Sequence, residues 1–301
     1  MKSTSIIFLA AISIATICNQ ISARTADAQS TSTHIIKELP LPTVPDSLTQ
    51  PSDRADYIIK HFWDSLDFEK TASQFDDESL EQNFVNYINI FSHANASNLK
   101  GNIDTLMSTA ENTPSLAKKL YNLADKYLAT RESPFRNESL YIYFLQNEIN
   151  SQACGEAGRE RAKYRLQAAL KNRPGSQAAD FKFISRDGTS HTLSSLDADS
   201  HILLMFYDPD CNHCSETIEE IKSLNLNNIK IVAIDSEDDR ELWDTTKNAM
   251  PDSWTIGFAL DPIQNNDIYI FEEMPTLFLL DKSKKIILKD ASLSEIKGLC
   301  Q

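Results

Sequence analysis

A buried strand that leads through a Cys-x-x-Cys motif into a helix is the feature that most constrains the fold of this chain. The apolar run from Ile202 to Tyr207 has the length of a fully buried strand, and the acidic loop after it contains Cys211-Asn212-His213-Cys214. Ile218 and Ile221 follow at helical spacing and predict a helix over 215–223. The cysteine pair is therefore expected at the N-terminus of a helix.

This position favours thiol chemistry, because free backbone N–H groups and the helix dipole stabilise an anion at a helix N-terminus. Such a site can lower a cysteine pKa from about 8.5 to about 3.5–7.5, and the thiolate is the attacking form. We expect Cys211, on the loop side, to be the nucleophile and Cys214 to resolve the mixed disulfide. Asn212 and His213 lie between them, and a protonated His213 is expected to stabilise the thiolate and make the disulfide more oxidising.

The motif has two alternative interpretations, half of a zinc site and an inert disulfide. Structural zinc requires two more cysteine or histidine ligands, and Cys154, Cys300 and the scattered histidines lack the pair spacing. A disulfide that closes only two intervening residues adds little stability. We therefore expect a redox-active pair, with no metal and no cofactor. Cys154 and Cys300 could be buried thiols or a disulfide with each other, and the sequence leaves both open.

The charge balance excludes several classes of partner. The 301-residue chain has a formal net charge of −14 and no basic patch, which argues against nucleic acid and anionic membrane surfaces. Its length suits two domains.

The N-terminus has the pattern of a signal peptide over residues 1–28. Lys2 precedes an apolar stretch from Ile6 to Ile17, and Ala26-Asp27-Ala28 fits a small-x-small cleavage site. The apolar stretch is shorter than the roughly 20 residues of a spanning helix. Lipid attachment at Cys18 is not expected, because the bulky Ile17 precedes it. The predicted location is the periplasm or another extracytoplasmic compartment.

Two regions with different patterns follow this segment. Residues 29–51 contain Pro40, Pro42 and Pro45 among many hydroxyl residues, and we predict a flexible linker. Residues 52–173 show only helical periodicity and predict an irregular all-α bundle. An N-cap is predicted at Ser52, and helical windows are predicted at 76–93, 102–110, 114–129, 138–150 and 158–172.

Residues 176–301 alternate strands with helices. A hairpin is predicted over 181–193 with Asp187-Gly188 as its turn, and a closing hairpin over 276–288. Further elements are predicted at 202–207, 229–234, 238–248 and 292–299. This order predicts an α/β domain with a mixed central sheet flanked by helices, and the cysteines at the C-terminal end of a central strand. Met274-Pro275-Thr276, which opens a strand, is the predicted second part of the site and would bind substrate backbone.

The segment from Ala179 to Leu299 resembles thioredoxin-fold domains of the TlpA/ResA-like branch of exported thiol-disulfide oxidoreductases. The matching landmarks are Asp180-Phe181, Asp187-Gly188, the stretch from Phe206 to Cys214, and Met274-Pro275-Thr276 followed by Phe278-Leu279-Leu280-Asp281. The helical segment resembles a domain of unknown function that precedes such modules in some Gram-negative bacteria. The resemblance implies a nucleophile at Cys211, a resolving thiol at Cys214 and a cis-proline at Pro275.

Four residues depart from thioredoxin itself. Asp210 replaces a tryptophan, Asn212-His213 replaces Gly-Pro, and Met205 stands where thioredoxin has a buried acid. These departures leave the redox poise open.

Two function classes follow. The first is an enzyme that exchanges disulfides with protein thiols and disulfides of the cell envelope, working with a membrane or periplasmic redox partner. The second is a non-catalytic binding protein in which the helical domain recognises a partner and the thioredoxin-like part is a scaffold. The intact cysteine pair favours the enzyme.

Overall fold

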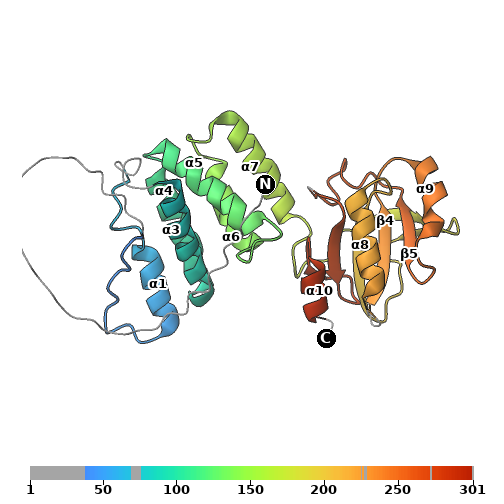
Figure 1. Cartoon of the computed structure of the whole chain (residues 1–301), viewed down its shortest axis with the longest axis horizontal. Coiled ribbons are helices and arrows are strands. Elements are labelled where there is room, and N and C mark those ends of the chain that lie inside the picture. Colours follow the sequence, from blue (N-terminus) through green and yellow to red (C-terminus); the bar gives the residue numbers. More distant parts are fainter. Residues whose placement is uncertain (1–37, 69–75, 225, 227–228, 272, 300–301) are drawn as a thin grey trace, which may run out of the picture. The chain divides into compact units, whose positions relative to one another are not determined.

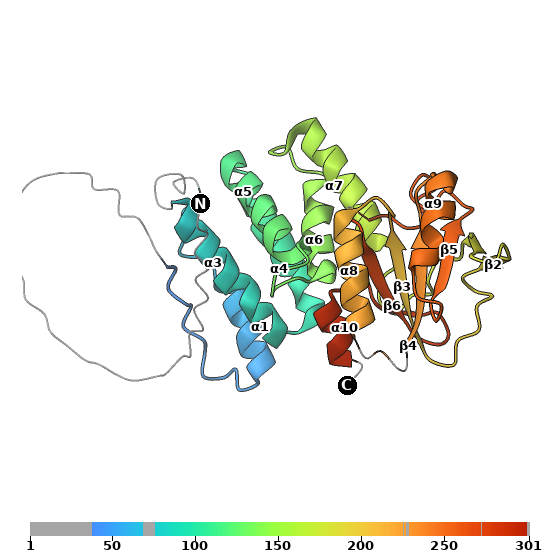
Figure 2. The ribbon, with the colours of Figure 1, turned by 45° about the vertical axis from the view of Figure 1, so that its right-hand side comes forward.

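The computed structural model describes residues 38–68, 76–224, 226, 229–271 and 273–299, all within one compact unit of the chain. Figures 1 and 2 show helices in the first part of this region and a helix-flanked sheet in the second. The predicted signal peptide, its cleavage site, Cys18 and Cys300 lie outside the described residues.

The helical region contains the elements that the periodicity predicts, with shifted ends. They are α1 (Pro51–His61), α3 (Asp77–Asn89), η1 (Ile90–His93), α4 (Ala96–Ala110), α5 (Pro114–Ala124), η2 (Asp125–Ala129), α6 (Glu138–Glu148) and α7 (Gly155–Leu170). The predicted N-cap at Ser52 is wrong: Gln50 is the N-cap, and Pro51 occupies the first turn, where its missing N–H has no helical partner to lose.

One apolar core holds the helical region together. Phe84, Ile103 and Met107 are fully buried, and an aromatic group of Phe62, Trp63, Tyr87 and Phe91 packs edge to face. Leu39 also belongs to this core, and its backbone N–H donates to Asn83 Oδ1 over 2.8 Å. The prediction of a flexible linker over 29–51 is therefore wrong at Leu39, because this apolar side chain is anchored among the helices.

The second region is a seven-stranded mixed sheet with the order β2-β1-β5-β4-β3-β6-β7. Its strands are β1 (Lys182–Ser185), β2 (Ser190–Thr192), β3 (His201–Tyr207), β4 (Ile229–Asp235), β5 (Thr255–Ala259), β6 (Thr276–Leu280) and β7 (Ile286–Leu288), and its helices are α8 (Asn212–Ser223), α9 (Arg240–Thr246), η3 (Lys247–Ala249) and α10 (Leu293–Leu299). Both predicted hairpins are present as antiparallel pairs. Strand β5 was not predicted.

Central strand β3 is apolar on both faces because each face of the sheet is covered. Leu203, Met205 and Tyr207 pack with α8 and α10, whereas Ile202, Leu204 and Phe206 pack with the aromatic core on the opposite face. Strand β3 pairs in parallel with β4 and antiparallel with β6. This pairing brings the end of β3 beside the start of β6, where the candidate site lies.

The segment that joins the helical region to the sheet itself pairs with β7. Gly175 donates its N–H to the Ile286 carbonyl over 2.7 Å, and Ile286 donates to the Ser176 carbonyl over 2.9 Å. Gln177 forms an isolated bridge with Lys285. The connection between the predicted regions 52–173 and 176–301 is therefore hydrogen-bonded to the sheet.

Within the described ranges, no helix has both the length and the apolar character needed to cross a lipid bilayer.

Candidate active site

The first cysteine is the N-cap of α8. Cys211 has an extended backbone (φ −87°, ψ 118°), and its sulfur accepts a hydrogen bond from the Cys214 N–H over 3.3 Å. Helix α8 thus begins at Asn212, three residues earlier than predicted, because the cysteine itself caps the helix. A backbone N–H aimed at the sulfur stabilises the thiolate more than the thiol.

The second cysteine lies one turn further into α8 and is only 1% exposed. Burial, followed by the neighbouring Cys211 sulfur, raises the pKa of Cys214 to about 12. Cys211 is half-buried, and both thiols are free. The two cysteines of the motif therefore differ in access, as the sequence predicts.

The Met274–Pro275 segment lies directly against this pair. The peptide bond between these residues is cis, as the resemblance implies, and β6 starts at the next residue. The Met274 carbonyl oxygen is 3.8 Å from Cys211 Sγ. The structure thus brings together the two segments, 211–214 and 274–275, that the sequence assigns to one site.

Asn212 and His213 occupy the first turn of α8 with exposed side chains. The His213 side chain is 63% exposed, and its Nδ1 lies 3.7 Å from a carboxylate oxygen of Glu216. No hydrogen bond joins its ring to either sulfur in the described part of the chain. The expected stabilisation of the thiolate by a protonated His213 stays a prediction.

One buried acid near the site was missed by the sequence reasoning. Asp235 ends β4 directly opposite Tyr207 of β3 and is 1% exposed. Its Oδ1 accepts from the Glu237 N–H over 3.0 Å, whereas Oδ2 has no hydrogen-bond partner among the described residues. Burial, assisted by the negative charge of Asp208, raises the pKa of Asp235 to about 7. The sequence feature that could have identified Asp235 is its position at the end of an apolar run, Ile229 to Asp235.

Within the described ranges, no group of three or more histidine, cysteine, aspartate or glutamate side chains is placed to hold a metal ion. His61, in α1, instead pairs with Asp64 over 2.6 Å.

Comparisons with known proteins address both regions. The family described as "Domain of unknown function (DUF5106)" matches residues 16–172. The chain is similar to the crystal structure of a thioredoxin-like protein from Bacteroides caccae, with 31% identity over 88% of this chain and 98% of that chain and a TM-score of 0.76. This match confirms the predicted α/β fold after a helical region.

Two further similarities each cover less than half of this chain. The C-terminal domain of an uncharacterized protein from Bacteroides fragilis is 29% identical over 44% of this chain and 99% of that chain, with a TM-score of 0.42. A thiol-disulfide oxidoreductase from Bacteroides fragilis is 24% identical over 41% of this chain and 99% of that chain, with a TM-score of 0.35. No curated protein is significantly similar to this chain in sequence.

Proposed function

This chain belongs to the DUF5106 family and shares the fold of a thioredoxin-like protein, and on that premise we propose that it is a thiol-disulfide oxidoreductase acting through Cys211 and Cys214. The observation that carries the proposal is the environment of the Cys211 sulfur. It caps α8, accepts the Cys214 N–H and stays partly accessible, while Cys214 is buried one turn away.

The reaction follows from this asymmetry. The Cys211 thiolate attacks one sulfur of a substrate disulfide, a protein–substrate disulfide forms, and the departing substrate thiolate takes up a proton. Cys214 then loses its proton and attacks the Cys211 sulfur, which releases the second substrate thiol. The substrate disulfide is reduced to two thiols, and the cysteine pair is oxidised to a disulfide. The reverse sequence oxidises a dithiol substrate.

The Met274–Pro275 segment is the proposed substrate-binding wall. Its Met274 carbonyl faces the Cys211 sulfur, so an extended substrate segment could align with this backbone beside the reacting atoms.

We also propose where the reaction takes place and which substrates and partner it involves. The signal-peptide pattern at residues 1–28 supports export, and the acidic chain supports protein substrates rather than nucleic acid. We assign the chain to the TlpA/ResA-like branch, with protein thiols and disulfides of the cell envelope as substrates and a membrane or periplasmic redox partner.

The test is the order of reaction of the two thiols. Brief alkylation of the reduced protein followed by peptide mapping should label Cys211 at least about 10-fold faster than Cys214, because Cys214 is buried and its pKa is raised. Cys214→Ser should accumulate mixed disulfides through Cys211, whereas Cys211→Ser should accumulate none. Cys154→Ser, which removes a thiol outside the motif, is the matched control and should behave as wild type.

Faster labelling of Cys214, or equal trapping by both motif variants, would reject this assignment. A scaffold protein with no thiol chemistry would show no difference in disulfide exchange between wild type and Cys211→Ser.

A further inference from the structure

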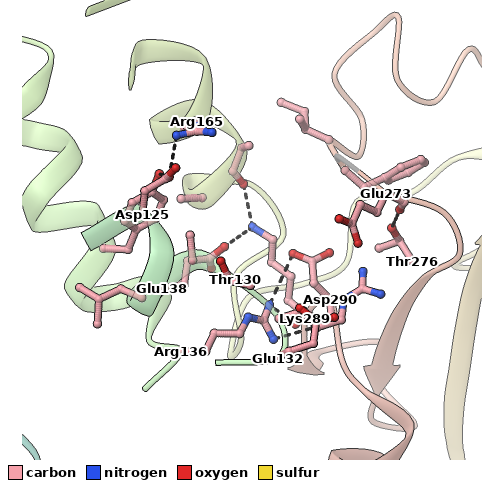
Figure 3. Close-up of a pocket in the computed structure, with 18 residues that line it drawn as sticks. Asp125, Thr130, Glu132, Arg136, Glu138, Arg165, Glu273, Thr276, Lys289 and Asp290 are labelled. Carbon is pink, nitrogen blue, oxygen red and sulfur yellow. Dashed lines mark hydrogen bonds and ion pairs between the residues drawn. The ribbon is translucent and has the colours of Figure 1, made fainter. Parts of the chain in front are cut away.

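A cavity of about 280 Å³ adjoins the segment that faces the Cys211 sulfur. Glu273 and Thr276, which flank Met274-Pro275, line one side of it, and residues of η2, α6 and α7 line the other (Figure 3). Its volume suits one long side chain, since pockets for drug-sized molecules are about 300–1,000 Å³. The cavity begins one residue away from the backbone that contacts the proposed nucleophile.

Ion pairs build the walls of this cavity. Arg165 Nη1 lies 2.6 Å from Asp125 Oδ1, and Lys289 Nζ lies 2.7 Å from Glu138 Oε1 (Figure 3). Arg136 donates to the carbonyl oxygens of Lys289 and Asp290, each over 3.1 Å. These charged groups pair with other groups of the cavity wall and fix its shape.

Among the other charged side chains that line the cavity, carboxylates predominate. Glu132 and Glu273 are exposed at the cavity, and neither has an ion pair or side-chain hydrogen bond within the described ranges. Asp290 Oδ2 is 3.7 Å from the Arg136 guanidinium, but Asp290 Oδ1 is shielded from solvent and has no partner among the described residues. A buried carboxylate oxygen without a donor costs free energy, which favours a further positive charge near Asp290.

Three cations lie near Asp290, namely Lys289, Arg136 and Arg131. Arg131 lines the cavity, and its Nη1 donates to the Pro275 carbonyl over 3.5 Å. It ties the helical region to the substrate-binding wall, and Glu132, Glu273 and Asp290 line the cavity beside it. Burial raises the pKa of Asp290, and a bound cation would favour its charged form.

We infer that this cavity is a specificity subsite for a lysine or arginine side chain of the substrate polypeptide, located within a few residues of the cysteine that exchanges with Cys211. The inference rests on the proposed function. A basic side chain supplies N–H donors to Asp290 and a positive charge to Glu132 and Glu273. Because an extended chain advances about 3.3 Å per residue, a side chain two or three residues from the reacting cysteine reaches the neighbouring cavity.

The experiment measures the rate at which reduced full-length protein cleaves the disulfide of a synthetic peptide. Each peptide has one cysteine, blocked as a mixed disulfide with 2-mercaptoethanol, and a single lysine, glutamine or glutamate scanned through three positions on each side. Cys211 forms the mixed disulfide, Cys214 resolves it, and the peptide thiol and mercaptoethanol are released while the protein is oxidised. Lysine should raise the second-order rate constant about 5-fold over glutamine on one side of the cysteine only, and glutamate should lower it.

Substitutions at the cavity test whether the preference for the lysine peptide arises there. The double variant Glu132→Gln/Glu273→Gln removes two exposed charges without touching the core, and Asp290→Asn suits the positive φ of 48° at this residue. Both should bring the lysine-to-glutamine rate ratio close to 1. Glu241→Gln, an exposed acid on α9, matches Asp290→Asn in net charge and should keep the ratio.

The outcomes separate the subsite from the reaction itself. If the glutamine peptide is not cleaved, the proposed function fails. If it is cleaved but lysine gives no advantage, or gives the same advantage at every position and loses it equally in Glu241→Gln, the subsite is overturned.

Discussion

At the scale of single residues, the site end of the sheet contains two ionisable groups whose neutral forms are favoured by burial. Cys214 and Asp235 are each 1% exposed, and burial is the largest cause of the raised pKa of both. Neither has a cation as a hydrogen-bond partner in the part of the chain described. The consequence for Asp235 is a measurable dependence of stability on pH.

Asp235→Asn should stabilise the protein increasingly as pH rises. The pKa of Asp235 is about 7 in the folded protein against an ordinary value of 3.8, so the unfolded chain loses this proton at lower pH than the folded chain. The contribution of Asp235 to the free energy of unfolding is therefore fully present below pH 3.8 and is lost as pH rises to 7. The gain in free energy of unfolding should be near zero at about pH 4 and about 2–4 kcal/mol at about pH 8, measured by urea denaturation.

The control is Asp199→Asn, which changes an exposed loop acid. It should shift stability by the same small amount at both pH values. A gain for Asp235→Asn that does not change with pH would contradict the assignment of a raised pKa.

The residues of the site show what sequence can and cannot locate. The cysteines and Met274-Pro275 were found because a local motif and a strand-opening proline mark them. The start of α8 was predicted three residues too late, since the Cys211 cap was not foreseen. Asp235 was missed because its burial depends on pairing between β3 and β4, which are distant in sequence.

At the scale of elements, strand β5 depends on the absence of a side chain at one position. A Cβ on Gly257 would lie 2.3 Å from a ring carbon of Phe183 and 2.9 Å from Ile234 Cδ1. The short run Thr255 to Ala259 contains this glycine, so its apolar pattern is too weak to predict a strand. The other strands were predicted because their apolar runs are longer or their turns are marked.

Gly257→Ala should destabilise the protein by about 1–3 kcal/mol, because the methyl group overpacks the core between β1 and β4. Gly101→Ala is the matched control: a Cβ at this exposed position in α4 meets nothing within 4 Å. It should stabilise by about 0.5–1 kcal/mol through helix propensity. Thermal unfolding compares them, and a loss of stability in both would point to another cause.

At the scale of the whole molecule, polar contacts join the helical region to the end of the sheet. Lys289 is buried and donates to Glu138 of α6 and to the Ala168 carbonyl of α7, each over 2.7 Å. Arg136 donates to two carbonyls of the same segment of the sheet region. A division into two regions was predicted from composition, whereas these contacts could not be, since they join segments that are far apart in the sequence.

Lys289→Met should lower the free energy of unfolding by about 2–4 kcal/mol, because it leaves the partly buried Glu138 carboxylate without its cation. Adding Glu138→Gln should recover part of this loss, and the double-mutant cycle gives the coupling. Lys163→Met, which breaks an exposed pair with Glu160, is the control and should change stability by less than about 1 kcal/mol. Additive effects of the Lys289 and Glu138 substitutions would show that the pair is not coupled.

The pairing of residues 175–177 with β7 also affects how this protein can associate with other chains. An open sheet edge is a template for strand addition and for aggregation. In this sheet the chain's own connecting segment already pairs with the outer edge of β7. The opposite outer strand of the described sheet is β2, which is three residues long. The connection between the two regions therefore blocks strand addition at the β7 edge. Shortening it would expose the hydrogen-bonding groups of β7 and would also change the spacing of the regions.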